Sequence, residues 1–445
     1  MLLRERSSKY AVMVVAVVLG LYAAGWFLLG PASGTLPAFA EPLHKAGILA
    51  TILATSLATI YGIYWMAYHR LDRGPQYAIT HALTLWRLKQ ALLDVGAGYV
   101  VEQYSGQEKV VVLPKIKVSF GDDLRYGTIE IRNHIKYTTQ LEKVNLSSAL
   151  GRYVLVEQPH LSGDGNWYIY EIEDSSVEWR LVFDDYQAFK SYCRQQEPYT
   201  LFVDKRVSLP LCSMLLVGET GSGKTYTLYS LVLQLANWDV APVLYFADPK
   251  GSSLYVMGGR IAPQRNAAKF KDMTELLEQF HAQMELRKEE LEKKLEEKLD
   301  ADYSHWKMKP HILIFDELAV YQGIVNTLDK STRDRLTSYL HDIVLMGRQL
   351  GFFLWSIMQK SDSKTISTAI RDNLPWKVVL GLAANTTYMT TFEHAADLPK
   401  QNFGPGEGLY TYSGRTQGPK VISFPTLNFD ILAATDEAIK RPPVM

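Results

Sequence analysis

The residues best suited to chemistry in this 445-residue chain form the pattern GxxxxGK[ST]: Gly218, Glu219, Thr220, Gly221, Ser222, Gly223, Lys224 and Thr225. The glycines let the backbone bend so that successive N–H groups point at phosphate oxygens. The Lys224 ammonium can reach the β and γ phosphates, and the Thr225 hydroxyl can coordinate Mg²⁺. An apolar strand over 213–217 precedes the loop and a helical run over 226–235 follows it. The pattern and its setting predict a Walker A loop that binds ATP.

A second element predicts the acidic partner of that magnesium ion. Four apolar residues over 312–315 indicate a buried strand, and Asp316 and Glu317 follow it directly. In parallel sheets the ligand site lies beyond the carboxyl ends of the strands. We therefore expect Asp316 to hold Mg²⁺ through water and Glu317 to act as the general base toward an attacking water. The acidic pair of this Walker B strand favours hydrolysis over phosphoryl transfer to a small acceptor.

Further strands are predicted over 243–247, 352–358 and 377–382, with helices between them over 333–350 and 364–372. This alternation is typical of a parallel sheet with helices on both faces. Gln359 follows an apolar strand, so it is suited to sense the γ-phosphate or to orient water. The alternative is an ordinary strand-end amide with satisfied hydrogen bonds.

Arg348 lies at the end of the predicted 333–350 helix. In an oligomer its guanidinium could reach the γ-phosphate of a neighbouring subunit as an arginine finger. Arg371 is the second candidate for this role, and an ordinary surface arginine is the alternative for either position.

Composition excludes several classes of protein. The chain has 47 basic and 47 acidic side chains, 47% hydrophobic residues and 2 cysteines. A disordered protein and a disulfide framework are therefore excluded, and zinc has no supporting ligand spacing. The zero net charge also excludes a protein that coats nucleic acid through bulk charge, although it allows a local track.

Two charge-free apolar segments predict transmembrane helices over about 11–29 and 46–68. A signal peptide is the alternative for the first segment, but a second apolar segment follows it closely. Basic residues flank the outer ends of the pair: Arg4, Arg6, Lys9, Arg70, Arg73, Arg87 and Lys89. The loop between the segments carries only Glu41 and Lys45. The positive-inside rule then places both termini, and everything after about residue 70, in the cytoplasm.

The middle segment predicts a small α+β domain. An amphipathic helix is expected over 76–93 and a short helix over 142–151. Strands are expected over 110–118, 126–132, 153–157 and 167–172. No polar residues converge there into a catalytic set, so an assembly or adaptor role is favoured. The predicted domains are a membrane anchor over 1–70, this domain over 71–210 and a motor over 211–445.

Several motifs together resemble the FtsK/SpoIIIE group of hexameric DNA translocases in the HerA-FtsK class. The matching segments lie at 218–225, 248–250, 314–317, 347–351 running into Gln359, 370–375 and 404–408. The similarity covers about residues 140–430. The resemblance implies a RecA-like P-loop ATPase fold, with ATP and Mg²⁺ as ligands and DNA as cargo.

Two features differ from chromosomal FtsK proteins, which usually have about four membrane spans and a winged-helix domain after the motor. This chain has two predicted spans, and it ends soon after the predicted motor. The compact layout looks like the TcpA-type coupling ATPases of conjugative elements. That likeness implies a membrane-bound ring, expected to be a hexamer, that pulls DNA toward a secretion channel, with a relaxase and channel proteins as further partners. A DNA pump in cell division or sporulation and a protein-secretion or regulatory ATPase remain the alternatives.

Two further features concern the DNA track. A long helix with alternating Glu and Lys is expected over 273–299, more typical of a solvated helix than of a coiled-coil contact. Non-specific phosphate contacts would suffice for a motor that moves along any sequence. The candidates for such contacts are Arg260, Arg265, Lys269, Lys330, Arg333 and Arg335. Simple surface charge is the alternative for each of them.

Overall fold

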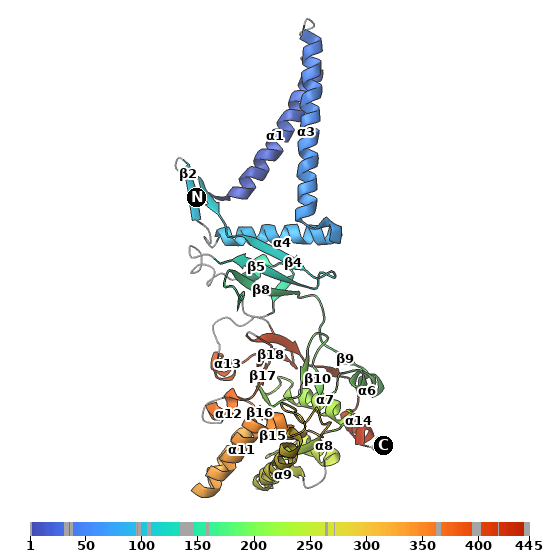
Figure 1. The fold of residues 1–445 in the computed structure, drawn as a ribbon, viewed down its shortest axis with the longest axis vertical. Helices are drawn as coiled ribbons and strands as arrows, with labels where there is room; N and C mark the ends of the chain where they lie inside the picture. Colours follow the sequence, from blue (N-terminus) through green and yellow to red (C-terminus); the bar gives the residue numbers. More distant parts are fainter. Residues whose placement is uncertain are drawn as a thin grey trace. The chain divides into compact units, whose positions relative to one another are not determined.

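The computed structural model divides into two compact units, residues 1–177 and 178–445, and each is described by itself (Figure 1). It describes residues 2–30, 35, 39–94, 96, 99–104, 108–133, 146–156, 160–262, 266–270, 272–361, 366–393, 402–416 and 418–439. The division at 177/178 precedes the 210/211 boundary that we expected between the middle domain and the motor. Residues 178–210 therefore belong to the second unit.

The first unit begins with an apolar helical hairpin of α1 (Arg6–Leu29) and α3 (Ala40–Tyr68). The helices approach closely at glycines, since a Cβ on Gly25 would lie 2.4 Å from Thr51 Oγ1. Segments Ala11–Leu29 and Ala40–Tyr68 are long and apolar enough to cross a membrane. The two predicted apolar helices are thus confirmed. The second starts at residue 40 rather than 46, because Glu41 and Lys45 extend it with an i,i+4 ion pair of 2.6 Å.

In the rest of this unit, α4 (Pro75–Asp94) packs on an antiparallel sheet of order β4-β5-β8-β6, with β7 paired to β8. The strands are β4 (Ile116–Phe120), β5 (Tyr126–Arg132), β6 (Tyr153–Leu155), β7 (His160–Leu161) and β8 (Trp167–Asp174). A separate sheet contains β1 (Leu2–Glu5), β2 (Tyr99–Tyr104) and β3 (Glu108–Val112).

Two predictions for this domain need correction or fall outside the described residues. The single strand expected over 110–118 is two strands, β3 and β4, because Pro114 between them has no N–H to continue a ladder. Of the helix expected over 142–151, residues 142–145 lie outside the described residues, and Leu146–Ala149 form the 3-10 turn η3.

The second unit is built on a sheet of order β14-β13-β15-β16-β12-β17-β18-β19 within its described residues. The strands are β12 (Met214–Gly218), β13 (Val243–Ala247), β14 (Ala267–Ala268), β15 (His311–Asp316), β16 (Phe352–Met358), β17 (Trp376–Leu380), β18 (Glu407–Tyr412) and β19 (Lys420–Ser423). All pairings from β14 to β17 are parallel, and β18 and β19 add an antiparallel edge. The β13-β15-β16-β12-β17 order is that of RecA-like ATPases, so the predicted fold class is confirmed.

Helices cover both faces of this sheet. The helix α7 (Lys224–Ala236) contacts α14 (Ile431–Ile439), which also contacts α8 (Ser253–Ile261). The helix α9 (Asp272–Leu295) contacts α11 (Lys330–Leu350). The connection from β12 to β13 runs through α7 toward one edge of the sheet, whereas the connections through α9 and α11 run back toward β12. Because each crossover is right-handed, connections that run in opposite directions place their helices on opposite faces of the sheet.

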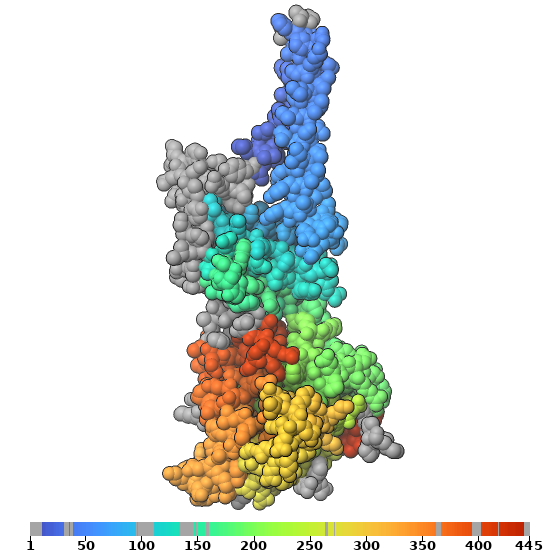
Figure 2. Space-filling view, viewed as in Figure 1, coloured from blue at the N-terminus to red at the C-terminus, as the bar shows by residue number. Residues whose placement is uncertain are grey.

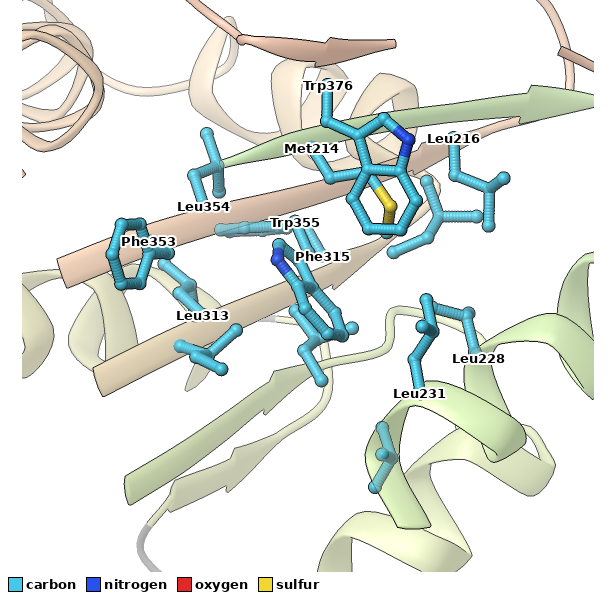
Figure 3. Packing of buried hydrophobic residues seen from close by; sticks show 14 of the residues in the cluster. Met214, Leu216, Leu228, Leu231, Leu313, Phe315, Phe353, Leu354, Trp355 and Trp376 are labelled. Atoms are coloured by element: carbon cyan, nitrogen blue, oxygen red, sulfur yellow. The ribbon is translucent and has the colours of Figure 1, made fainter. Parts of the chain in front are cut away.

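The core of the second unit lies between the central strands and these helices. Continuous apolar strands bury both faces, as is usual for parallel sheets, and Trp355 and Trp376 are among the largest fully buried side chains. Figure 3 shows them packed with Met214, Phe315 and Leu354 above Leu228 and Leu231 of α7. The Trp355 indole N–H donates to the carbonyl of Cys212 at 2.9 Å. This packing fixes the relative positions of the strands whose ends form the site.

The segment before the sheet wraps onto the same unit. It contains β9 (Val182–Phe183), α6 (Tyr186–Arg194), β10 (Thr200–Phe202) and β11 (Ser208–Pro210). β9 pairs in parallel with β20 (Thr426–Leu427), close to the end of the described chain. Phe183, Phe189 and Phe202 contact one another at ring distances of 5.2 to 6.1 Å. This aromatic cluster explains why residues that we assigned to the middle domain belong to the second unit.

Candidate active site

The phosphate loop lies at the carboxyl end of β12 and leads into α7. Gly221 and Gly223 have φ angles of 86° and 91°, which favour glycine. A Cβ on Gly218 would lie 2.5 Å from Ser222 Oγ and 3.0 Å from the Leu380 carbonyl oxygen. The loop therefore needs these glycines both for its turns and for its close packing against β17. The predicted residues 218–225 lie together, with the N-terminus of α7 at the carboxyl edge of the sheet.

Lys224 is held inside the loop by backbone oxygens. Its ammonium donates to the carbonyl of Gly218 and, at 3.0 Å, to that of Glu219. Burial lowers the pKa of Lys224, and the carboxylates of Glu317 and Asp316 oppose this effect. The lysine thus stands between the phosphate loop and the Walker B carboxylates, where a bound phosphate chain would compete for its protons.

Asp316 and Glu317 lie at the carboxyl end of β15, two strands away from the phosphate loop. Burial, followed by the charges of Asp248 and Glu317, raises the pKa of Asp316 to about 6. Glu317 has a φ of 60°, a left-handed conformation that a glutamate adopts at a cost of about 1–3 kcal/mol. It begins the helix α10 (Leu318–Val325) with a mostly buried side chain. Strain of this kind is typical of a functional position.

A magnesium ion fits this arrangement. Burial first, and the nearby carboxylates second, raise the pKa of Asp316, and a divalent cation beside this carboxylate would stabilise its charged form. Asp316 and Thr225 are the side chains that could hold it. Within the described residues no group of three or more His, Cys, Asp and Glu side chains could hold a metal ion. Mg²⁺ usually takes one or two protein ligands together with phosphates and water, and Asp316 and Thr225 could supply these two.

Asp316→Asn is expected to raise the thermal stability of the nucleotide-free protein. The pKa of Asp316 in the folded protein, about 6, lies above the ordinary value of 3.8. Ionised Asp316 therefore destabilises the fold, with the full effect above about pH 6. This destabilisation is lost as the pH falls from about 6 toward 3.8. Thermal unfolding at neutral pH and at about pH 5 measures the effect. The advantage of Asp316→Asn over wild type should shrink on acidification, whereas Asp239→Asn, at an exposed position, should show no gain. A lower melting temperature for Asp316→Asn at neutral pH would contradict the assignment.

Asp248 and Lys250 belong to the site as well, although the sequence marked them only through the family resemblance. The fully buried Asp248 carboxylate accepts hydrogen bonds from the backbone N–H groups of Lys250, Gly251 and Ser252 at 2.7 to 3.1 Å. It thereby fixes the loop that carries Lys250, whose ammonium lies 3.9 Å from a Glu317 carboxylate oxygen. Lys250 is thus a second cation, after Lys224, close to Glu317.

Gln359 follows β16, the strand between β12 and β15. The register pairs Val217 with Met358 and Asp316 with Ile357. Gln359 is therefore exposed at the same edge as the phosphate loop and the Walker B pair. Its role as a sensor or water-orienting group stays a prediction.

Arg348 lies near the amino ends of the strands, opposite the carboxyl ends that carry the phosphate loop. It is exposed near the end of α11, which leads into the amino end of β16. It is therefore remote from the phosphate loop of its own chain, as an arginine finger acting on another subunit must be. The second candidate, Arg371 of α12 (Thr368–Asp372), is 8% exposed and ion-paired with Asp372 at 3.2 Å. Arg348 is thus the more available of the two.

The basic residues suggested for a DNA track are mostly engaged within the chain. Arg260 pairs with Asp436 at 2.7 Å, Arg335 pairs with Glu278 at 2.9 Å, and Lys269 lies over the Tyr255 ring. Arg333 lies 4.0 Å from Asp334, and Arg265 lies outside the described residues. These contacts fit the alternative of ordinary surface charge, and a DNA contact at any of the six candidates stays a prediction.

A glycine-rich segment, residues 404–408, packs directly on the phosphate loop, and we call it the glycine loop. The Gly406 N–H donates to the Ser222 carbonyl at 2.8 Å, and a Cβ on Gly223 would lie 2.3 Å from the Gly406 nitrogen. Arg180 holds this loop by donating to the Pro405 carbonyl at 2.8 Å and pairing with Glu407 at 3.1 Å. Sequence reasoning missed Arg180, because no local pattern links it to residues so distant in the chain.

Arg180→Ala is expected to weaken ATP binding by roughly tenfold, since it removes an ion pair and a hydrogen bond that support the phosphate loop. Because Arg180 acts through the glycine loop, KM for ATP should rise more than kcat falls, and Arg180→Lys should recover part of the loss. The control is Arg415→Ala, which removes an exposed arginine over the Tyr412 ring. An unchanged KM in Arg180→Ala would show that the contact does not support nucleotide binding.

Comparison with known proteins gives one match by sequence. No family model matches the chain. The FtsK domain-containing protein YdcQ of Bacillus subtilis (strain 168) is 30% identical over 183 residues, which are 40% of this chain and 36% of that protein. The chain thus spans about a third of the length of this relative. The predicted resemblance to FtsK-type proteins is confirmed over that segment.

Solved structures with a similar chain course include the conjugation coupling protein TcpA of pCW3, in its monomer form with ATPgS. It has a TM-score of 0.48 and 18% identity, covering 80% of this chain and 99% of that one. EssC (ATPases 2 and 3) from Geobacillus thermodenitrificans has a TM-score of 0.44 and 15% identity, covering 59% of this chain and 51% of that one.

Proposed function

We propose that this FtsK-like protein is a membrane-anchored ATPase that translocates DNA, acting as a coupling protein that delivers DNA to a secretion channel during conjugative transfer. The observation that carries the ATPase assignment is the meeting of the phosphate loop, Asp316, Glu317 and Gln359 at one edge of a RecA-like sheet. DNA as cargo rests on the FtsK-type motifs and on the FtsK domain-containing relative. The conjugative role rests on the order of two apolar helices, a small domain and a motor along this chain.

Each residue at that edge has a task in the proposed hydrolysis. Lys224 would exchange its carbonyl partners for the β and γ phosphates, while Thr225 and Asp316 would hold Mg²⁺. The ion, when bound, neutralises charge on the phosphates. Glu317 accepts the proton of the attacking water, and Gln359 orients that water.

The proposed location is the cell membrane, with both termini and the motor in the cytoplasm. Support comes from the two apolar helices and from the basic residues that flank them in the sequence. Two spans of this length would make a stable anchor.

DNA-stimulated hydrolysis by the full-length protein in nanodiscs is the direct test. ATP turnover is measured alone, with double-stranded DNA and with single-stranded DNA of matched length. We expect a several-fold stimulation by one of the two, and its loss at high salt because the contacts are with phosphates. Turnover that is substantial but insensitive to both DNAs, in an assembled ring, would favour protein cargo.

The proposed ring, expected to be a hexamer, has a test of its own. If Arg348 acts on the site of a neighbouring subunit, mixtures of Arg348→Ala and Lys224→Ala subunits should recover activity. Each mixed interface can combine an intact phosphate loop from one subunit with an intact arginine from the next. Lys224→Ala mixed with an Asp316→Ala subunit is the control, because both variants damage the same site. Absence of rescue at every mixing ratio would remove Arg348 from this role.

A further inference from the structure

The helix α4 carries an apolar stripe that the described part of the chain leaves uncovered. Ile79, Leu83 and Trp86 are 55%, 49% and 59% exposed. Their spacing of four and three residues places them within an arc of about 60° on one face of the helix. Three large apolar side chains in one stripe form a patch that calls for a partner, unlike scattered single residues.

The opposite face of α4 already has its partner. Tyr77, Leu85, Leu88 and Leu92 are buried in the core that α4 shares with the sheet of the first unit. The rings of Tyr77 and Phe120 of β4 lie 6.1 Å apart, edge to face. The helix is thus apolar on two opposite faces, and packing on the sheet explains only one of them.

The uncovered face of α4 lies opposite the face that packs on the sheet, and Figure 1 draws the apolar hairpin on the side of α4 away from that sheet. His69, directly after α3, contacts the buried His81 of α4 through their Nδ1 atoms at 2.9 Å, which ties the end of the hairpin to the helix. Within the first unit, α4 runs across the foot of the hairpin, with β4, β5 and β8 on its other side (Figure 1). In Figure 2 the outer part of the hairpin projects beyond α4 and the described residues of the sheet. A bilayer that contains the hairpin would therefore meet the stripe.

The charges around α4 suit a lipid surface. Residues 70–94 contain four basic side chains, Arg70, Arg73, Arg87 and Lys89, and two acidic ones, Asp72 and Asp94, a net charge of +2 (4 − 2). Basic residues beside a span favour anionic headgroups, and tryptophan is enriched at the membrane interface. Helices that lie in the interface combine such an apolar stripe with flanking basic residues.

We propose that α4 lies in the plane of the cytoplasmic membrane interface, with Ile79, Leu83 and Trp86 inserted among lipid headgroups and upper acyl chains. The inference rests on the proposed membrane anchoring of the hairpin. The sheet packed beneath α4 is then held against the bilayer by a helix in contact with lipid, and not by the ends of the spans alone.

Depth-dependent quenching in proteoliposomes tests this contact. The full chain, with buried Cys193 and Cys212 replaced by serine, receives one cysteine labelled with an environment-sensitive fluorophore. The test position is Leu83→Cys, the control inside a span is Ile60→Cys, and the control in an exposed turn of the same domain is Asp122→Cys. Vesicles of phosphatidylcholine and phosphatidylglycerol carry nitroxide-labelled lipids at a shallow or a deep position.

The pattern of quenching distinguishes an interfacial helix, a stripe covered by a second copy of the chain and a hairpin that is not in the membrane. We expect loss of fluorescence at Ile60 and Leu83 but not at Asp122, with shallow nitroxides more effective than deep ones at Leu83. Quenching at Ile60 with none at Leu83 would overturn the interfacial helix and leave the anchor intact. If the fluorophore at position 83 reported an apolar environment without quenching, the stripe would be assigned to a contact with a second copy of the chain. No quenching at Ile60 would overturn the anchor itself, and the inference with it.

Discussion

Replacement of Lys224 by alanine is expected to reduce ATP hydrolysis by about 10²- to 10³-fold or more, the effect of removing a preorganised donor from a transition state. The ammonium stands in the phosphate loop with its protons on the Gly218 and Glu219 carbonyls. Alanine cannot reach a phosphate, so both nucleotide affinity and turnover should fall. Steady-state turnover and equilibrium binding of a fluorescent ATP analogue measure the two losses separately.

The control for this variant is Lys298→Ala, which removes a lysine just beyond α9 and leaves the site intact. Its turnover should equal that of the wild-type protein. Near wild-type turnover in Lys224→Ala would exclude the motor assignment, provided that thermal unfolding shows a folded protein.

Glu317→Gln is expected to bind ATP almost normally and to lose about 10²- to 10⁴-fold in turnover, the contribution of a positioned general base. The amide has the shape of the carboxylate but cannot take the proton of the attacking water. Its neutral side chain also removes a negative charge close to the phosphates, so affinity for ATP should hold or rise. A single-turnover assay with prebound ATP isolates this chemical step.

A matched control exists at Glu393. Like Glu317, it is a glutamate in the left-handed region, with a φ of 63°, and its partner is Lys377 at 3.3 Å. Glu393→Gln should leave hydrolysis unchanged. If Glu317→Gln turned over ATP at the wild-type rate, the general base would have to be sought elsewhere, and at a residue other than Asp316, which is proposed to hold the metal.

The sheet and the strand ends that form the candidate site were largely predictable because they depend on local patterns. The apolar strand β16 has the predicted bounds, and β15 extends the predicted 312–315 by one residue at each end. Such strands are predictable because a strand buried on both faces is a continuous apolar run ended by a polar residue. The short edge strands β18 and β19 were not predicted. Their amphipathic pattern is weak, and they form only because β17 offers an unpaired edge.

The parts of the site that escaped prediction depend on contacts between distant residues. Gly223 and Gly406 lie 183 positions apart (406 − 223), yet their backbones touch. Arg180 was assigned to another domain, and nothing near it in sequence indicates a partner at Pro405 or Glu407. Periodicity and spacing describe single elements, so packing between elements is beyond their reach.

The position of Arg180 also has a mechanical consequence. It lies three residues after Val177, where the chain leaves the first unit, and it bonds the loop that rests on the phosphate-binding turn. A tensile load on the chain at this crossing point would therefore reach, within three residues, the side chain that holds the glycine loop against the candidate nucleotide site. Because coupling free energies are reciprocal, a load that loosens ATP must itself be resisted more strongly when ATP is bound.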